Sequence, residues 1–532
     1  MPGTYTYPGV YIEEIPSGVR TITGVSTSDT AFVDFFRRGP LDKAVRISSF
    51  ADFERVFGGL DTRSEASYAI QQYFLNGGSV AWVVRVAAGN FDSAFLTLQG
   101  GSPPQDALTV AAVSPGVWAN NLQVGVDYKT ADPATMFNLV VREVATVRGK
   151  QQVVNSEVHR NLSMSQASSR YAVSVVNEAS SLVRLTDEGL GERPAATGAD
   201  VIGAPDDADF TPLGGTANDG DVPGGNDWRT ATGANAIRGS ALQKTGLHAL
   251  DRIDPFIFNI LCIPAAADLD ANGFSAVVAE AETYCLDKRA FLIVDIPADV
   301  DTKDDMLGWM AANDGLRHTN AAVYFPRLLV PDALNENRPR NVAASGTLAG
   351  VYARTDATRG VWKAPAGTDA DLRGANLAVK IGDRENGDLN PIGINALRNF
   401  AVFGNVSWGA RTLDGADQAA SEWKYIPVRR LALYLEESLY QGSKWIVFEP
   451  NDEALWSQIR LNFGAFMHGL FRQGAFQGTT PREAYFVKCD KETTTQDDIN
   501  RGVVNILVGF APLKPAEFVV IKIQQMAGQI EA

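Results

Sequence analysis

Cysteine and histidine are scarce in this chain of 532 residues, which contains three cysteines and four histidines. The cysteines lie far apart with no CxxC pair, and no histidine stands at metal-ligand spacing from another histidine or from a cysteine. The pattern argues against a disulfide framework and against a zinc site, and it favours buried thiols in a reducing compartment. We therefore expect no metal and no cofactor.

The chain also lacks the signatures of nucleotide binding and of common hydrolases. It contains no GxxxxGK[ST], GxSxG or HExxH motif, and no GxGxxG that opens a helix after a strand. Acidic residues are numerous, so pairs of carboxylates arise by chance and carry little weight for acid–base catalysis. We expect a protein that is not an enzyme.

Positive charge is in deficit as well, because 47 Lys+Arg stand against 62 Asp+Glu, a formal net charge of 47 − 62 = −15. Nucleic-acid binding needs clustered basic residues, so we expect no nucleic-acid partner. No apolar run approaches the ~20 residues of a membrane-spanning helix. The first basic residue is Arg20 and no apolar signal region precedes it, so we predict neither a secretory signal nor insertion into a membrane.

One stretch resembles the first half of a calcium-binding loop. Asp268–Gly273 places oxygen ligands at the first, third and fifth positions of an EF-hand pattern and glycine at the sixth. The bidentate carboxylate belongs at the twelfth position, where the chain has Ala279, and Glu280 comes one residue late. We interpret the stretch as a turn into a helix over Ser275–Leu286. An acidic surface protein, a calcium-binding protein or a hydrolase without a recognisable motif remains the alternative function.

The residues that are present have globular composition, with 45% hydrophobic and 20% charged residues. Strand-like runs alternate with helix-like runs, which predicts a mixed α/β architecture with several domains. The expected parts are an extended N-terminal arm over 1–24, the first part of an α/β domain over 25–90, an inserted, mostly β domain over 91–245, the second part of the α/β domain over 246–394, and a C-terminal domain over 395–532.

Local signals predict individual elements in the first half of the chain. Ser49 is expected to cap a helix over Phe50–Phe57, and a second helix over Glu65–Leu75 is expected to end at the following Asn-Gly-Gly. In the inserted domain we predict short strands, among them Ala172–Val176. Residues 187–227 hold ten acidic residues against one basic residue, which predicts a solvated, mobile surface loop.

The C-terminal domain has the most regular pattern. Apolar spacing predicts a helix over Val428–Tyr440 and a second one over Asp452–Phe471, with Asn451 as its cap. Three strand-like runs follow, over Ala484–Cys489, Val503–Phe510 and Phe518–Ile523.

Both ends of the chain carry a short strand without an obvious partner. Gly9–Ile15 is flanked by prolines and cannot stabilise itself, and Glu517–Ile523 is an apolar terminal strand. Either strand could pair within its own subunit, which is the commoner case for a terminal strand, or could add to a sheet of a neighbouring subunit by β-augmentation. A repeated contact of the second kind produces an open polymer if it does not close.

An ordered set of motifs resembles that of contractile phage tail sheath proteins. Each motif is weak alone, but the set is specific and covers roughly residues 1–90 and 250–532. The motifs are Tyr7-Pro8-Gly9-Val10-Tyr11-Ile12-Glu13-Glu14, Gly24-Val25-Ser26-Thr27-Ser28, Asp52-Phe53-Glu54 with Phe57-Gly58-Gly59, Phe74-Leu75-Asn76-Gly77-Gly78 before Val83-Val84-Arg85-Val86, Trp408-Gly409-Ala410-Arg411-Thr412, and Tyr425-Ile426-Pro427-Val428-Arg429-Arg430.

The resemblance implies a structural subunit of a contractile sheath. Such subunits polymerise as stacked hexameric rings around an inner tube, and energy stored in the metastable extended lattice drives the tube through a target envelope on contraction. The partners implied are further copies of the chain, the inner tube protein, and baseplate and terminal cap proteins, with the inserted domain facing outward. Assembly would take place in the bacterial cytoplasm. The product would be a phage virion tail or a released or cytoplasmic injection particle, and the short sheath slightly favours the injection particle.

The resemblance also implies which residues bind neighbouring subunits. In the family, the N-terminal arm and the C-terminal strand extend into the C-terminal sheets of neighbours. Carried onto this chain, these are Val10, Tyr11, Ile12, Glu13 and Ile15 of the arm, and Phe518, Val519, Val520, Ile521, Lys522 and Ile523 of the strand. The family's C-terminal domain lines the inner surface of the sheath, so Arg460 is a possible contact to the inner tube. A helix that only packs a core is the alternative reading of that segment.

Overall fold

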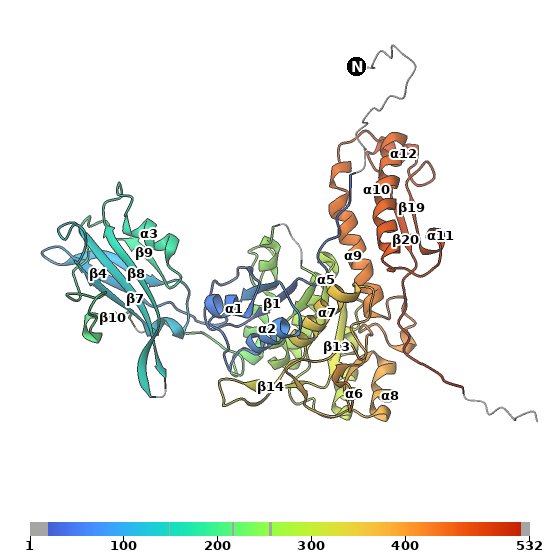
Figure 1. Cartoon of the computed structure of the whole chain (residues 1–532), viewed down its shortest axis with the longest axis horizontal. Helices are drawn as coiled ribbons and strands as arrows, with labels where there is room; N and C mark the ends of the chain where they lie inside the picture. The colour runs from blue at the N-terminus through green and yellow to red at the C-terminus, as the bar shows by residue number, and fades with distance from the viewer. Residues whose placement is uncertain (1–19, 148, 215–216, 255–257, 523–532) are drawn as a thin grey trace, which may run out of the picture. The chain divides into compact units, whose positions relative to one another are not determined.

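The computed structural model describes residues 20–147, 149–214, 217–254 and 258–522. The described part of the chain forms two compact units (Figure 1). Of the described residues, those within Ser26–Arg430 make up the larger unit, and residues 20–25 join residues 431–522 in the smaller, C-terminal unit. Several sheets and many helices are present in the described residues, so the predicted mixed α/β fold class is confirmed.

The larger unit is organised by an eight-stranded sheet with the strand order β18-β17-β13-β12-β11-β1-β3-β2. Its six central strands are parallel, and the two edge strands, β2 and β18, are antiparallel to their neighbours. Central strands such as β1 and β13 are buried on both faces, which explains why they read as continuous apolar runs. The strands are β1 Thr30–Asp34, β2 Val45–Ile47, β3 Ala81–Arg85, β11 Ile260–Cys262, β12 Phe291–Val294, β13 Ala321–Phe325, β17 Ile394–Phe400 and β18 Gly404–Ser407.

Helices pack against this sheet. Helix α1 covers Phe50–Phe57, and the hydroxyl of Ser49 accepts the Asp52 N–H at its start, as the sequence predicts. It ends at Gly58, whose φ of 91° is in the left-handed region that favours glycine. The predicted second helix is also present. The helices of this part are α2 Glu65–Asn76, α4 Gly233–Arg238, α5 Ala271–Lys288, α6 Lys303–Ala312, α7 Ser345–Arg359 and α8 Asp383–Leu389, and a small sheet is formed by β14 Leu328–Asp332, β15 Arg338–Val342 and β16 Asn376–Leu377.

Residues from about 91 to 220 form two antiparallel sheets around a hydrophobic core of their own. One segment of this region is a helix where we predicted a strand. Helix α3 covers Ala172–Ala179, and its buried residues Ala172 and Val176 are four positions apart, which is the spacing of one helical face. The strands are β4 Phe95–Gly100, β5 Gln105–Ala112, β6 Leu122–Asp127, β7 Met136–Val147, β8 Lys150–Ser163, β9 Val183–Asp187 and β10 Thr211–Pro212.

The described residues of the acidic segment 187–227 are mostly irregular and few of them are buried, as predicted, but the segment is not solvated throughout. Among its described residues, Phe210 and Leu213 are buried, and Thr211–Pro212 pairs with β6 as strand β10. The Arg142 guanidinium lies 3.7 Å from the centre of the Phe210 ring. Composition overstated the solvation because it counts charges, whereas a few apolar side chains spaced between them are enough to attach the segment to a core.

The residues that resemble a calcium loop have local structural roles. The Asp270 carboxylate caps α5 by accepting the Gly273 N–H at 2.7 Å. The Asp268 carboxylate accepts hydrogen bonds from the Gly224 N–H and the Arg229 guanidinium. Within the described ranges, no group of three or more His, Cys, Asp and Glu side chains is arranged to hold a metal ion. In the same residues, no helix is long and apolar enough to cross a membrane.

A buried arginine joins the inserted region to the eight-stranded sheet. Arg85 is 1% exposed, and its guanidinium donates to the carbonyl oxygens of Phe36, Gly39 and Pro115, each at 2.8 Å. Burial lowers the pKa of Arg85 to about 10. The carboxylate of Asp219 lies at the same junction and accepts the Val117 N–H at 2.8 Å.

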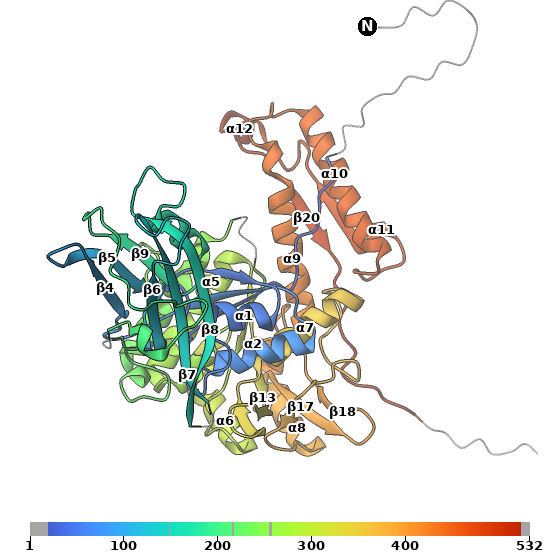
Figure 2. The ribbon, with the colours of Figure 1, turned by 60° about the vertical axis from the view of Figure 1, so that its left-hand side comes forward.

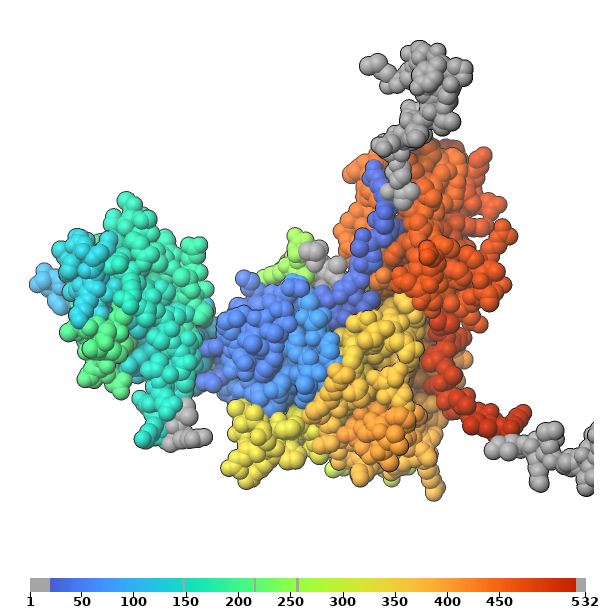
Figure 3. Space-filling model, viewed as in Figure 1, coloured from blue at the N-terminus to red at the C-terminus, as the bar shows by residue number. Residues whose placement is uncertain are grey.

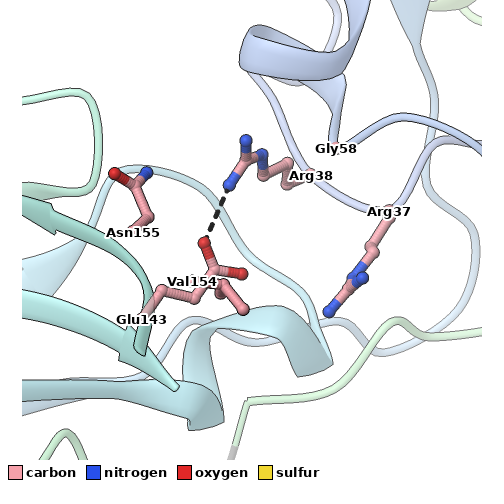
Figure 4. Close-up of a pocket in the computed structure, with 6 residues that line it drawn as sticks. All are labelled: Arg37, Arg38, Gly58, Glu143, Val154 and Asn155. Atoms are coloured by element: carbon pink, nitrogen blue, oxygen red, sulfur yellow. Dashed lines mark hydrogen bonds and ion pairs between the residues drawn. The ribbon is translucent and has the colours of Figure 1, made fainter. Parts of the chain in front are cut away.

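A hollow of about 220 Å³ lies beside this junction (Figure 4). Arg38 and Glu143 point toward each other across it, with Nη1 and Oε2 3.1 Å apart. Arg37 also lines the hollow, and its guanidinium lies apart from this pair. Polar contacts therefore hold the inserted region against the part of the chain that carries the eight-stranded sheet.

We predict that Arg85→Met destabilises the protein by about 3 kcal/mol, because three buried carbonyl oxygens lose their donor. The midpoint of urea unfolding of the full chain measures the effect. Arg55→Met is the matched control, since the Arg55 side chain is 69% exposed and pairs with Asp52 at the surface. Equal midpoints for the two variants would contradict the assigned role of Arg85.

Candidate strand-exchange site

The C-terminal unit is built on two long helices. Helix α9 covers Ile426–Gly442, and from Leu431 it belongs to this unit; α10 covers Glu453–Arg472 (Figure 2). The rings of Tyr434 and Phe466 bring them together with 6.2 Å between centroids. Both helices occur where the apolar spacing predicts them.

The cap of helix α10 lies one residue later than predicted, at Asp452. The Asp452 carboxylate accepts the Leu455 N–H at 3.0 Å, and its negative charge is favourable at a helix N-terminus. The Asn451 side chain, which we predicted as the cap, instead accepts the indole N–H of Trp456 and donates to the carbonyl of Val503. Asn451 therefore ties the helix to the segment that leads into the last strand.

A two-stranded antiparallel ribbon packs on α10. Strand β19 covers Tyr485–Lys488, and strand β20 covers Leu507–Phe510. Val487 and Val508 are directly opposite each other and pack, partly buried, against the same core as Ile459 of α10. The ribbon thus has one face fixed by hydrophobic packing.

The other face of the ribbon is covered by one aromatic ring. Phe486 is opposite Gly509, and a Cβ placed on Gly509 would lie 2.2 Å from the Phe486 ring. The ring can cross the neighbouring strand only because position 509 is glycine. Phe486 remains 50% exposed, so this face still offers apolar surface.

The edges of the ribbon are open in the described part of the chain. There, β19 pairs with β20 alone, and β20 pairs with β19 alone. A two-stranded ribbon is marginal by itself, and the unpaired N–H and C=O groups along an edge are a template for another strand. The ribbon can therefore accept strands.

After β20 the chain forms one isolated bridge, Pro512 with Phe476, and then leaves the ribbon. The Ala511 N–H still donates to the Ala484 carbonyl at 2.8 Å, but residues 513–522 contain no helix or strand. Phe518, Val519, Val520 and Ile521 are 76%, 80%, 78% and 80% exposed. The predicted terminal strand is therefore extended into solvent in the single chain, with four consecutive apolar side chains uncovered.

Six of the predicted site residues lie outside the described residues. These are Val10, Tyr11, Ile12, Glu13 and Ile15 of the arm, together with Ile523. Lys522 is described and is exposed.

Arg460 is engaged within its own unit. Its guanidinium donates to the Cys489 carbonyl at the end of β19 and to the Glu453 carboxylate of α10, the latter at 2.6 Å. The hydrogen bond from Arg460 lowers the pKa of Glu453. The Arg460 side chain is 34% exposed, so about a third of it remains accessible to another molecule.

Sequence reasoning missed two features of this unit. The pairing of Phe486 with Gly509 left only a weak signal, namely one glycine within an apolar strand-like run. Residues 20–25, assigned to the arm and to the start of the first domain, lie against α9 and α10, and Ile22 is buried in the core of this unit. No local pattern in the sequence indicates that contact, because its partners are more than 400 positions away.

Comparison with known proteins identifies this unit. Residues 418–526 match the family of the phage tail sheath C-terminal domain. The tail sheath protein of Vibrio phage KVP40 is 30% identical over 187 residues, which are 35% of this chain and 26% of the relative. The chain thus matches about a quarter of that relative's length.

Solved structures extend the likeness to nearly the whole chain. The helical sheath of the anti-feeding prophage in its contracted state is 24% identical, with a TM-score of 0.54, covering 98% of this chain and 100% of the other. A sheath tail protein of Listeria innocua is 13% identical, with a TM-score of 0.58, covering 93% and 96%. These likenesses establish the fold. The resemblance inferred from the motifs is thereby confirmed: residues 418–526 belong to the family of the phage tail sheath C-terminal domain, and the chain is similar to tail sheath proteins in sequence and in fold.

Proposed function

We propose that this protein is the structural subunit of a contractile sheath. Its copies polymerise as stacked hexameric rings around an inner tube and contract to drive that tube through a target envelope. The observation that carries the proposal is that one chain contains both a ribbon with open edges, β19–β20, and an exposed apolar tail, Phe518–Ile521. Each feature is unfavourable in a single chain and is satisfied by a second copy.

Strand exchange satisfies both features at once. A tail donated to the ribbon of a neighbour pairs its main-chain groups along the open edge and buries alternate side chains. Each buried apolar side chain contributes ~1.5–3 kcal/mol. The donor tail and the acceptor ribbon are different surfaces, so the contact is head-to-tail and repeats without limit unless it closes into a ring. The arm residues 10–15 are the second donor in this proposal.

Contraction then needs no chemical fuel. The energy is stored during assembly in contacts between subunits, and exchanged strands keep their main-chain pairing while the bodies they connect rotate. The anti-feeding prophage has been solved as a helical sheath in a contracted state and also as a baseplate, which supports a baseplate as a further partner. A terminal cap completes the proposed assembly.

The setting follows from the same likenesses. Curated relatives are phage proteins, and solved neighbours include extracellular contractile injection systems. We propose assembly in the bacterial cytoplasm and incorporation into an injection particle, with a phage virion tail as the alternative. Capsid and terminase genes next to the gene of this protein would show that the sheath is part of a phage virion tail.

The outer side of α10 is the proposed surface toward the inner tube. Gln458, Leu461, Ala465 and His468 form one exposed stripe along the helix, and Leu461 is 53% exposed. Arg460 lies beside this stripe and adds a cation to it.

We predict that Arg460→Gln lowers the amount of inner tube protein that co-purifies with sheaths at least threefold in low salt, because a cationic contact is lost. Glu453→Gln is the matched control, since it removes the same ion pair within α10 but keeps the cation. Equal loss in both variants would mean that Arg460 acts only within its own subunit.

The function as a whole is tested by negative-stain electron microscopy of the full chain and of a variant that lacks residues 1–19. The full chain should form hollow striated cylinders, and the shortened chain should stay folded but unpolymerised, because one donated strand is missing. A monodisperse full-length chain, expressed with and without its genomic neighbours, would contradict the proposal. Normal cylinders from the shortened chain would remove the arm from it.

We predict that Val520→Pro reduces the yield of sheaths more than tenfold. Proline removes a main-chain donor from the exchanged strand and cannot occupy a central strand position. Val520→Thr retains that donor and a β-branched side chain, and it should assemble normally. Polymer yield is measured by sedimentation; wild-type yield from the proline variant would show that the tail is not exchanged.

A further inference from the structure

Residues 20–25 lie as a short extended segment against the helices of the C-terminal unit (Figure 3, the blue strip against orange). The Arg20 N–H donates to Oδ1 of Asn462 on α10 at 3.0 Å. The Val25 N–H donates to the hydroxyl of Ser438 on α9 at 3.2 Å. Both ends of the segment are therefore held by main-chain hydrogen bonds to side chains of the helices.

The middle of the segment interlocks with a helix at two glycines. Ile22 is 6% exposed, and a Cβ on Gly442 would lie 2.6 Å from its side chain. A Cβ on Gly24 would lie 2.0 Å from the Tyr434 hydroxyl. At Gly442 and Gly24 the segment and α9 approach so closely that a side chain on either glycine would displace the side chain it meets.

The N-terminal end of the segment makes further contacts through the side chain of Arg20. The Arg20 guanidinium lies 4.8 Å from the centre of the Trp445 ring and 3.9 Å from the Glu449 carboxylate. Asn462 is 1% exposed, and its Nδ2 has no partner among the described residues. A buried amide whose oxygen already binds one peptide group is placed to bind a second one with its nitrogen.

We propose that Ile22, Gly24, Gly442 and Asn462 form a clamp that fixes where the N-terminal arm leaves its own subunit. This inference rests on the proposed function and adds the residues that decide which neighbour receives the arm. From Ile15, the last residue of the donated strand, to Arg20 there are five residue steps, which span at most about 18 Å. While the clamp holds residues 20–25, the arm can reach only a ribbon that lies within about 18 Å of Arg20. When the clamp is open, the free chain extends to residue 25, so the arm can reach the ribbons of several neighbours.

The test uses hydrogen exchange on the unassembled full chain, read by mass spectrometry over residues 20–25, together with sheath yield and length. Gly442→Val should raise the exchange rate of this segment at least tenfold and reduce the yield of regular sheaths by a similar factor. Gly469→Ala is the matched control, because a Cβ there has nothing within 4 Å. It should change neither quantity.

Ile22→Ser is a second variant that opens the clamp, and it does so without adding a side chain to α9. It therefore separates loss of the clamp from a folding defect caused by crowding at Gly442. A chain lacking residues 1–19 should keep the protection of residues 20–25, because the clamp does not require the arm. Regular sheaths of normal length from clamp variants that have lost protection would overturn the clamp and leave the sheath function intact. Wild-type chains that keep the protection but never polymerise would overturn the sheath function instead.

Discussion

Unpaired main-chain hydrogen-bonding groups along the β19–β20 ribbon are the constraint on which the C-terminal unit depends. One face of the ribbon is packed on α10, so the strands cannot turn away, and in the described residues neither edge has a strand beside it. Such an edge attracts another strand whether or not the partner is the right one. In the proposed polymer, another copy of the chain supplies this strand, and the open edge becomes the contact between subunits.

The two units of the chain have different physical characters. The larger unit is built around a mostly parallel sheet whose central strands are buried on both faces. The smaller unit has instead a ribbon whose edges are open in the described residues, and it holds 10 basic and 14 acidic residues, −4 of the net charge of −15.

Patterns of local origin predicted the fold well. Ser49, Gly58 and the Asn-Gly-Gly after α2 mark helix ends through their own backbone chemistry, and α9 and α10 follow from apolar spacing alone. The segment 172–179 was misread because a short apolar run fits a strand and a buried helix equally. The contacts of Ile22 with Gly442 and of Arg20 with Asn462 could not be predicted, since they join positions more than 400 residues apart.

The exchange of strands is the central claim, and a cryo-electron microscopy map of the assembled polymer tests it most directly. The account predicts a sheet in which β19 and β20 are flanked by two additional strands, with side-chain density for residues 10–15 and 518–523 contributed by other copies of the chain. A polymer in which the ribbon stays two-stranded, or is completed by residues of its own chain, would contradict the account.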